Sequence, residues 1–366
     1  MLPGSVGGTE IYLRHLIDAW TQSSLPHEIL LFVNRESADT FSDSRGLQVV
    51  VCPVRAVRRP ERILWEQFRL PAYCRRYRVD VLFNAGFTAP GVPGCPSVTV
   101  FHDLQHVLHP EWFRWWDRIP WKTLLGLSAR VSTKILCVSA QTRKDFLKHY
   151  LRAPEDVAVV EHGVDEQFRQ LQWEPDTVRP YVFCSATTHP HKNFQRLLHA
   201  FYVFRQQAPK YRLEITGVHG FSTKTIKEQI AALGLKNSVR LNGWLPREEF
   251  YRLCRGATAS IYPTLFEGFG MPVLESLAAG IPTACSDIEP LRTIAGSAAL
   301  RFNPHSVDAI TSALRRICLD AELRRYLHDA GPVQAAPYSW TRTAAETLVL
   351  LEQAAATRVR RAIRNS

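Results

Sequence analysis

The sequence predicts an α/β protein with two doubly wound domains, each built on a parallel sheet. Its 366 residues exceed what a single core usually holds, since cores stop growing near about 250–300 residues. Short apolar runs alternate with longer amphipathic stretches, which is typical of buried strands joined by helices. The alternation pauses once, at the polar stretch 165–180, and then resumes. We therefore expect this stretch to link the two domains.

The strands are predicted wherever a β-rich run is bounded by turn residues. In the first half these runs are Ile29–Val33, Val49–Val51, Val81–Phe83, Val98–Phe101, Ile135–Val138 and Val157–Val160, with helices predicted at Ile11–Trp20, Leu64–Tyr77 and Thr142–Tyr150. In the second half they are Tyr181–Cys184, Leu213–Ile215, Ser260–Tyr262 and Thr283–Cys285. Ligands of such sheets bind beyond the carboxyl ends of the strands, so we expect the chemistry in the loops that follow them.

Composition excludes several classes of protein. Hydrophobic residues make up 46% of the chain and charged residues 22%, which excludes wholesale disorder. The eight cysteines are scattered, with no Cys-x-x-Cys pair and no Cys/His cluster, so we expect reduced thiols and no zinc site. No run of about 18 apolar residues is present, and the start lacks the layout of a secretion signal. These features predict a cytosolic protein, and its net charge of +11 calls for an anionic partner or surface.

The most informative segment carries two glutamates, Glu267 and Glu275, around a glycine-rich turn. It follows the strand-like run ATASIYP and opens a helix; its inner residues are Gly268, Phe269, Gly270, Met271, Pro272, Val273 and Leu274. The glycines allow a ligand to approach the backbone, and the free N–H groups of a helix start bind anions. A solvated helix face behind a capping turn is the simpler alternative for a glutamate pair. The glycine-rich turn favours a ligand site.

A second segment, Thr187 to Asn193, follows the strand-like run that begins at Tyr181. It contains Lys192, and a lysine at the mouth of such a loop is a natural partner for a diphosphate. A lone surface lysine is usually only solvated. A cation and a helix-start anion site in one domain together indicate a diphosphate ligand.

These segments resemble the retaining glycosyltransferases of family 4, which have the GT-B fold. The resemblance covers nearly the whole chain, and the Glu-x7-Glu segment is its most specific part. Further matches are Gly7-Gly8, Phe101-His102-Asp103, Val138-Ser139, His162-Gly163-Val164-Asp165, Lys192-Asn193, the segment 239–243 and Tyr338-Ser339-Trp340. The stretch from Ile63 to Pro71 and the run HDLQHVLHPEWF are most similar to bacterial mannosyltransferase-like members.

The resemblance implies roles for individual residues. Catalytic roles fall to Glu267 at the donor-sugar hydroxyls, His102 near the reacting carbon and Lys192 at the diphosphate, while Glu275 binds the ribose. A satisfied loop histidine is the alternative for His102. The full implied donor-binding set is Gly7, Gly8, Thr187, Lys192, Asn242, Gly268, Phe269, Gly270, Met271, Pro272, Val273, Leu274 and Glu275. No cofactor or essential metal is implied.

The implied fold is GT-B, with two Rossmann-like domains facing a cleft. We expect an acceptor-side domain at 1–170, a nucleotide-sugar-binding domain at 171–337, and a C-terminal helix with a basic tail at 338–366 that returns to the first domain. Family members open with a strand before the glycine loop, but here the loop comes almost at once. Either the start is truncated or the first sheet lacks a central strand, which would leave ladder groups unpaired.

Basic and aromatic residues gather in the segment 109–153 of the first domain. It contains nine Lys/Arg against three acidic residues, and the four tryptophans Trp112, Trp115, Trp116 and Trp121. Tryptophan beside arginine suits a bilayer headgroup layer. The equally weighted alternative is that the tryptophans pack in the core and the charges form a solvated face.

The predicted function is retaining transfer of a hexose, with mannose favoured, from a nucleotide-diphosphate sugar to a glycan or lipid-linked acceptor. The enzyme would serve polysaccharide or lipopolysaccharide synthesis in the cytoplasm, at the inner face of the membrane. Another GT-B enzyme, such as a nucleotide-sugar epimerase, and a truncated non-catalytic nucleotide-sugar binder are the alternatives. Nucleic acid is not an expected partner, because no zinc finger or RNA-recognition signature is present.

Overall fold

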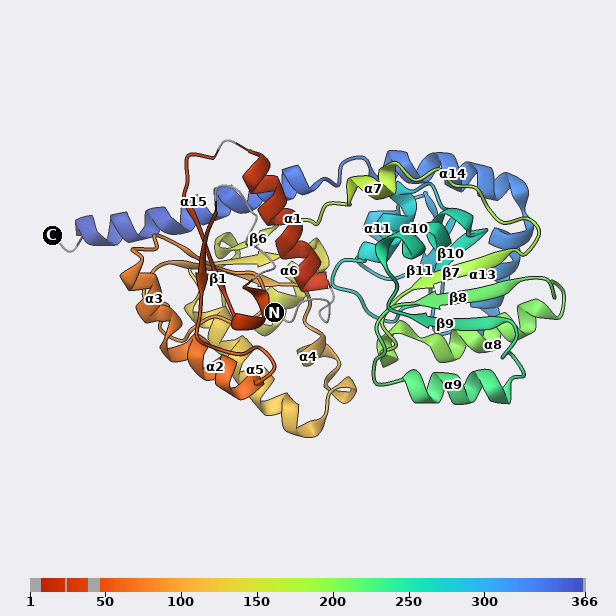
Figure 1. Ribbon diagram of the computed structural model, residues 1–366, viewed down its shortest axis with the longest axis horizontal. Coiled ribbons are helices and arrows are strands. Elements are labelled where there is room, and N and C mark those ends of the chain that lie inside the picture. Colours follow the sequence, from red (N-terminus) through yellow and green to blue (C-terminus); the bar gives the residue numbers. More distant parts are fainter. Residues whose placement is uncertain (1–7, 24, 39–46, 365–366) are drawn as a thin grey trace. The chain divides into compact units, whose positions relative to one another are not determined.

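The computed structural model describes residues 8–23, 25–38 and 47–364 (Figure 1). It divides into two compact units. Unit 1 comprises Met1–Gly163 with Trp340–Ser366, and unit 2 comprises Val164–Ser339. The chain therefore passes from unit 1 to unit 2 and back, and the C-terminal helix belongs with the first half of the sequence.

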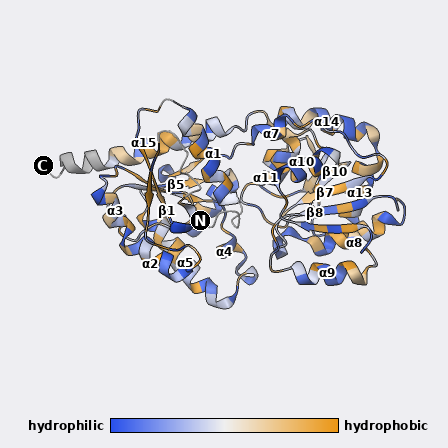
Figure 2. Cartoon of the chain, viewed as in Figure 1, coloured by the Kyte–Doolittle hydropathy of each residue, from blue (hydrophilic) through white to orange (hydrophobic). Residues whose placement is uncertain are grey.

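The strands of unit 1 form two parallel sheets. β1 (Ile29–Val33) pairs with β2 (Leu47–Val51), and a second sheet has the order β3 (Leu82–Asn84), β4 (Ser97–Phe101), β5 (Lys134–Cys137) and β6 (Val157–Val159). Within the described ranges no strand joins β1 to β3 by hydrogen bonds. β1 is uniformly hydrophobic (Figure 2), and β4 is buried at every residue.

Side chains of the first helix connect the two sheets of unit 1. Leu13 and Ile17 on α1 (Gly8–Gln22) pack with Val33 of β1 and with Ala85, which follows β3. In the described residues, the two sheets of unit 1 are thus held together by the burial of apolar side chains and not by backbone hydrogen bonds between strands. The other helices of unit 1 are α2 (Arg59–Phe68), α3 (Leu70–Arg76), α4 (Gln105–Leu108), α5 (Trp115–Val131), α6 (Ala140–His149) and α15 (Trp340–Arg364).

The C-terminal helix α15 packs against α1. The indole N–H of Trp20 donates to the carbonyl of Ala344 at 3.1 Å, and the rings of His15 and Trp340 stack with centroids 4.8 Å apart. These contacts hold α15 against α1 within unit 1.

One predicted helix is divided. The stretch Leu64–Tyr77 was expected to form a single helix, but α2 ends at Phe68 and α3 begins at Leu70. Pro71 stands in the first turn of α3 and has no N–H to continue the α2 ladder, so the break follows from the sequence.

Unit 2 contains a six-stranded parallel sheet with the order β12-β11-β10-β7-β8-β9. The strands are β7 (Tyr181–Ser185), β8 (Arg212–Thr216), β9 (Val239–Gly243), β10 (Ala259–Tyr262), β11 (Thr283–Ser286) and β12 (Ala299–Phe302). Its helices are α7 (Glu166–Arg169), α8 (Phe194–Arg205), α9 (Thr223–Ala232), α10 (Arg247–Gly256), α11 (Met271–Ala278), α12 (Leu291–Ala295), α13 (Val307–Leu319) and α14 (Ala321–Ala335). The chain builds outward from β7 to β9, then starts again at β10. The strand order therefore reverses between β7 and β10, where doubly wound sheets bind their ligands.

The polar stretch 165–180 is not a free linker, which corrects the interpretation from sequence. It begins with α7, whose Arg169 guanidinium donates to the carbonyls of Ala335 and Tyr338 at 3.1 and 2.8 Å. The indole N–H of Trp173 donates to the carbonyl of Ala257 at 2.7 Å. Polar composition here reflects hydrogen bonding along the surface of unit 2.

All eight cysteines are buried, and none of them forms a disulfide in the described part of the chain.

Helices α11 and α14 approach each other closely at Gly331. A Cβ at this glycine would lie 2.7 Å from the carbonyl oxygen of Leu277. The absence of a side chain therefore permits this helix pair.

We expect Gly331→Ala to lower the free energy of unfolding by about 1–3 kcal/mol, because the new methyl group must push α14 away from α11. Gly126→Ala is the matched control. Gly126 also lies inside a helix, but nothing lies within 4 Å of its Cβ position, so alanine should add up to about 1 kcal/mol. Urea denaturation of both variants measures the difference, and equal changes would contradict the role of close packing.

Candidate functional site

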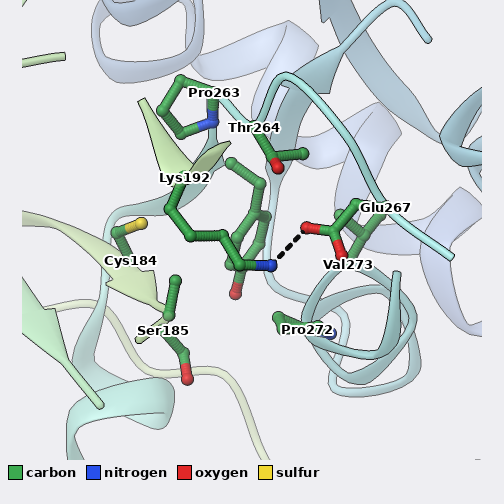
Figure 3. A pocket seen from close by; sticks show the side chains of 10 residues that line it. Cys184, Ser185, Lys192, Pro263, Thr264, Glu267, Pro272 and Val273 are labelled. Atoms are coloured by element: carbon green, nitrogen blue, oxygen red, sulfur yellow. Dashed lines mark hydrogen bonds and ion pairs between the residues drawn. The ribbon is translucent and has the colours of Figure 1, made fainter. Parts of the chain in front are cut away.

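The candidate site lies where the strand order of unit 2 reverses. A pocket there is lined by the ends of the two adjacent strands, Cys184 and Ser185 of β7 and Tyr262 of β10, and by the loops that follow them (Figure 3). The remaining lining residues are Ala186, Lys192, Pro263, Thr264, Glu267, Pro272 and Val273. The two segments singled out from the sequence therefore meet in one pocket.

An ion pair crosses this pocket. The Nζ atom of Lys192 lies 2.6 Å from Oε1 of Glu267, and each side chain is only 15% exposed (Figure 3). Lys192 ends a short 3-10 turn, Pro190–Lys192, after β7, and Glu267 lies between β10 and α11. At this burial, either charge without its partner would raise the free energy of the folded protein. A ligand whose anionic group binds Lys192 must therefore give Glu267 another favourable contact.

Asn193 fixes the position of the lysine loop. Its backbone is left-handed, with φ of 59°, and its side-chain amide donates to the carbonyls of Pro263 and Pro304 at 2.9 and 2.8 Å. The N–H of Leu265 also donates to the carbonyl of His191 at 2.7 Å. The loops after β7 and β10 are thus joined by hydrogen bonds on both sides of the ion pair.

The glycine-rich turn delivers the start of α11 to the same pocket. Gly270 has φ of +115°, and a Cβ there would collide with Leu291, so the turn requires glycine. Pro272 has no N–H, and the N–H groups of Val273 and Leu274 donate to the Gly270 carbonyl at 3.0 and 3.2 Å. Within the described part of the chain, the helix start therefore presents Gly270 and Met271 as its N–H groups without an intrahelical acceptor.

Glu275 lies one turn farther along α11, away from the pocket-lining residues. Its pKa is raised to about 8, chiefly by burial and to a smaller extent by the Asp165 carboxylate, while the Arg247 guanidinium acts in the opposite direction. Arg247 is itself 3.1 Å from Asp165, to which the Tyr251 hydroxyl also donates at 3.4 Å. A buried carboxyl that is largely protonated at neutral pH can both donate and accept hydrogen bonds with hydroxyl groups.

Asn242 and Thr187 come from the ends of β9 and β7, the two strands that flank β8. The Asn242 amide donates to Oε2 of the buried Glu214 at 3.0 Å, so Glu214 on β8 orients it on β9. Thr187 follows β7, next to Gly217, whose missing side chain lets the β8 loop contact the backbone of Ala186. Neither residue lines the Lys192 pocket.

His102, Gly8 and Gly7 belong to unit 1. Burial lowers the pKa of His102 to about 4, so its imidazole is neutral, and Nε2 donates to the carbonyl of Ala85 at 2.8 Å. Its other nitrogen is then an acceptor. Gly8 is exposed and begins α1, with open space at its Cβ position, while Gly7 lies outside the described residues.

Several residues at the site were not found from the sequence. Arg247 and Glu214 each act on a predicted site residue from a distant position in the chain. Asn193 was matched from the sequence together with Lys192, but its contacts with Pro263 and Pro304 were not predicted. Arg247 lies in α10, which carries no motif, and its effect on Glu275 depends on packing. The only sequence signal was Asn193 directly before a helix, since asparagine tolerates left-handed backbone.

Asn193→Ala should lower the free energy of unfolding by about 3 kcal/mol, because two buried carbonyls lose their donor and alanine disfavours φ of 59°. Asn193→Gly removes the amide but keeps the backbone conformation, so it should cost less. Thermal denaturation of the two variants separates the contributions. Unchanged stability in both would mean that the two loops are held by other contacts.

Glu275 should make stability fall as pH rises. Folding raises the pKa of this acid from 4.5 to about 8, so the folded state binds the proton more tightly, and stability is lost between these values as the carboxylate forms. The loss is at most about 1.4 kcal/mol per pH unit. Glu275→Gln should flatten the dependence, whereas the exposed Glu228→Gln should leave it unchanged. Parallel curves of unfolding free energy against pH for wild type and Glu275→Gln would contradict this.

No helix in the described ranges combines the length and hydropathy needed to cross a bilayer. Nor do the described residues include a group of three or more His, Cys, Asp or Glu side chains placed to hold a metal ion.

The chain is similar to known bacterial mannosyltransferases. It is 25% identical over 268 residues to the O-antigen chain mannosyltransferase B of Escherichia coli, covering 69% of each chain. It is 32% identical over 256 residues to the MMP alpha-(1->4)-mannosyltransferase of Mycolicibacterium hassiacum, covering 66% of this chain and 61% of that one. The chain thus spans less than two thirds of the second relative.

Solved structures share the fold over nearly the whole chain. The sucrose-phosphate synthase of Thermosynechococcus elongatus superposes with a TM-score of 0.78 at 18% identity, covering 96% of this chain and 95% of that one. Anabaena Alr3699/HepE in complex with UDP and glucose gives 0.76 at 16% identity, covering 96% and 98%. These similarities confirm the predicted GT-B fold.

Two family models account for both units. The model for Glycosyltransferase Family 4 matches residues 6–168, and the model for Glycosyl transferases group 1 matches residues 165–334. Family 4 enzymes are retaining and metal-independent hexosyltransferases. With its sequence motifs, its two α/β units and both models in agreement, the chain belongs to glycosyltransferase family 4.

Proposed function

We propose that this chain transfers a hexose, with mannose favoured, from a nucleotide-diphosphate sugar to a glycan or lipid-linked acceptor, with retention at the anomeric carbon. The observation that carries the proposal is the Lys192–Glu267 pair beside the start of α11, where the strand order of unit 2 reverses. A cation, a helix N-terminus and a carboxylate within one pocket suit a diphosphate and the sugar attached to it.

Different residues of unit 2 bind different parts of the donor. Lys192 and the N–H groups of Gly270 and Met271 contact the diphosphate, and Glu267 accepts hydrogen bonds from hydroxyls of the donor sugar. Glu275 binds the ribose hydroxyls. Asn242, held by Glu214, lies at the end of β9, where the base is contacted. Thr187 and the turn residues Gly268 and Phe269 complete the walls around the donor.

In the transfer, the bond between the anomeric carbon and the phosphate oxygen breaks, and its electron pair stays on that oxygen. The acceptor hydroxyl oxygen forms the new bond on the same face of the sugar, and its proton passes to the leaving phosphate. Negative charge therefore develops on the diphosphate, where Lys192 and the helix start stabilise it. By the family resemblance, neutral His102 and the glycine loop at Gly7 and Gly8 in unit 1 also take part in donor binding.

Mannose is favoured because relatives with similar sequences carry mannosyltransferase names, among them the O-antigen chain mannosyltransferase RfbU of Salmonella typhimurium, 25% identical over 222 residues. The same relatives support a role in polysaccharide or lipopolysaccharide synthesis. Nucleotide-diphosphate sugars are made in the cytoplasm. We therefore propose that the enzyme acts there, at the inner face of the membrane.

Lys192→Ala should reduce kcat by about 10²–10³-fold, because the leaving diphosphate loses its cation in the transition state. Transfer is measured with a panel of UDP-, GDP- and ADP-sugars, and a donor that carries mannose should be used best. Lys224→Ala is the control, since that lysine is 89% exposed on α9 and should be dispensable.

Melting temperature with and without nucleotide provides a second measurement, because ligand binding stabilises the folded state. Nucleotide-induced stabilisation without transfer would instead identify a non-catalytic binder. Full activity of folded Lys192→Ala would overturn the assignment.

A further inference from the structure

Two helices of unit 1 expose a surface that the donor site does not use. On α5, Trp115, Trp116 and Ile119 are 72%, 54% and 74% exposed. At the helical spacing of about 100° per residue, these three side chains lie on one face, with Arg118 and Lys122 along its edge. We call this set, together with Arg114, the Trp–Arg face.

The other tryptophans of the segment do not belong to this surface. Trp112 stacks on His109 with ring centroids 4.0 Å apart, and Trp121 packs against the buried cluster around Phe101 and Phe146. The structure thus divides the two interpretations of the segment: some of its tryptophans pack, and others stand out from the protein.

Helix α2 contacts α5 and also carries exposed apolar side chains. The guanidinium of Arg59 lies 3.3 Å from the Asp117 carboxylate and 4.7 Å from the ring centroid of Trp121, so the first turn of α2 contacts the first half of α5. Leu64 and Phe68 on α2 are 59% and 74% exposed. In Figure 2 both helices carry hydrophobic and hydrophilic residues together.

The charge of this surface is positive. Segments 58–69 and 114–122 contain seven Lys/Arg residues against three acids, and each acid is paired with an arginine. The pairs are Arg58–Glu61, Arg59–Asp117 and Arg62–Glu66, at 3.5, 3.3 and 3.5 Å. The excess is therefore basic, and it surrounds exposed apolar side chains.

We propose that the Trp–Arg face is a docking surface for an anionic lipid bilayer. Tryptophan places its ring at the level of the headgroups, isoleucine reaches the acyl boundary, and arginine and lysine contact lipid phosphates. A basic rim around apolar side chains complements a membrane that is negative at its surface and apolar below. The inference deepens the proposed lipid-linked acceptor, because it brings unit 1 to the surface in which such an acceptor is anchored.

Vesicle sedimentation tests the proposal with the full chain. Wild type should bind vesicles that contain phosphatidylglycerol at least about tenfold more tightly than vesicles of phosphatidylcholine alone, and high salt should remove the difference. The triple variant Trp115→Gln/Trp116→Gln/Ile119→Gln should lose about tenfold in binding to the anionic vesicles. Arg118→Glu/Lys122→Glu should lose a similar factor.

Matched controls lie in unit 2. Leu319→Gln/Tyr326→Gln/Val333→Gln removes three apolar side chains of similar exposure, 53%, 53% and 75%, and Lys224→Glu/Lys227→Glu reverses two exposed charges on α9. Both should bind vesicles like wild type. Melting curves verify that every variant is folded.

Wild type that ignores anionic vesicles, or a Trp–Arg triple variant that binds them unchanged, would overturn the proposal. If the natural partner were a soluble protein or a nucleic acid, wild type would not bind the anionic vesicles. Sugar transfer to a soluble acceptor analogue is measured on the same samples. A Trp–Arg variant that loses vesicle binding but retains sugar transfer would support the docking surface independently of the donor site. Vesicle binding without sugar transfer would count against the donor-site assignment alone.

Discussion

The reversal of strand order between β7 and β10 is the constraint on which the site depends. Adjacent parallel strands whose connections leave in opposite directions separate their following loops, and a crevice opens between them. Here one loop supplies Lys192 and the other Glu267, which come from positions 75 residues apart in the chain. The fold therefore assembles the charge pair from two segments that have no local reason to meet.

The ion pair gives Lys192 an internal counter-ion. Two partly buried charges at 2.6 Å are stable only because each satisfies the other, and Asn193 holds the loops in register. In the function that we propose, a diphosphate that binds Lys192 releases the Glu267 carboxylate for sugar hydroxyls. Donor binding would then exchange one set of charge contacts for another, so that Lys192 keeps a counter-ion throughout.

Much of this arrangement could be predicted from sequence because it depends on local patterns. Apolar runs located the strands apart from β9 and β12, which the prediction did not include, and the glycine turn between Glu267 and Glu275 marked a segment that lines the candidate pocket. What was missed depends on contacts between distant segments: Arg247 acts on Glu275 only through the packing of α10, and Glu214 orients Asn242 across two strands. The polar stretch 165–180 was misread for the same reason, since its partners lie near positions 256 and 336.

The net charge of the chain can likewise be assigned to separate regions of the structure. Lys192 is already balanced by Glu267, so the donor pocket contributes nothing to the net charge of +11. A nucleotide-binding site built from a helix start and one neutralised lysine does not need a basic protein. Part of the excess lies on α2 and α5, which also carry exposed tryptophan and isoleucine side chains that water solvates poorly. Basic charge and exposed apolar area therefore lie on the same helices. One partner surface that is both anionic and partly apolar explains the two features together, and no separate explanation is needed for each.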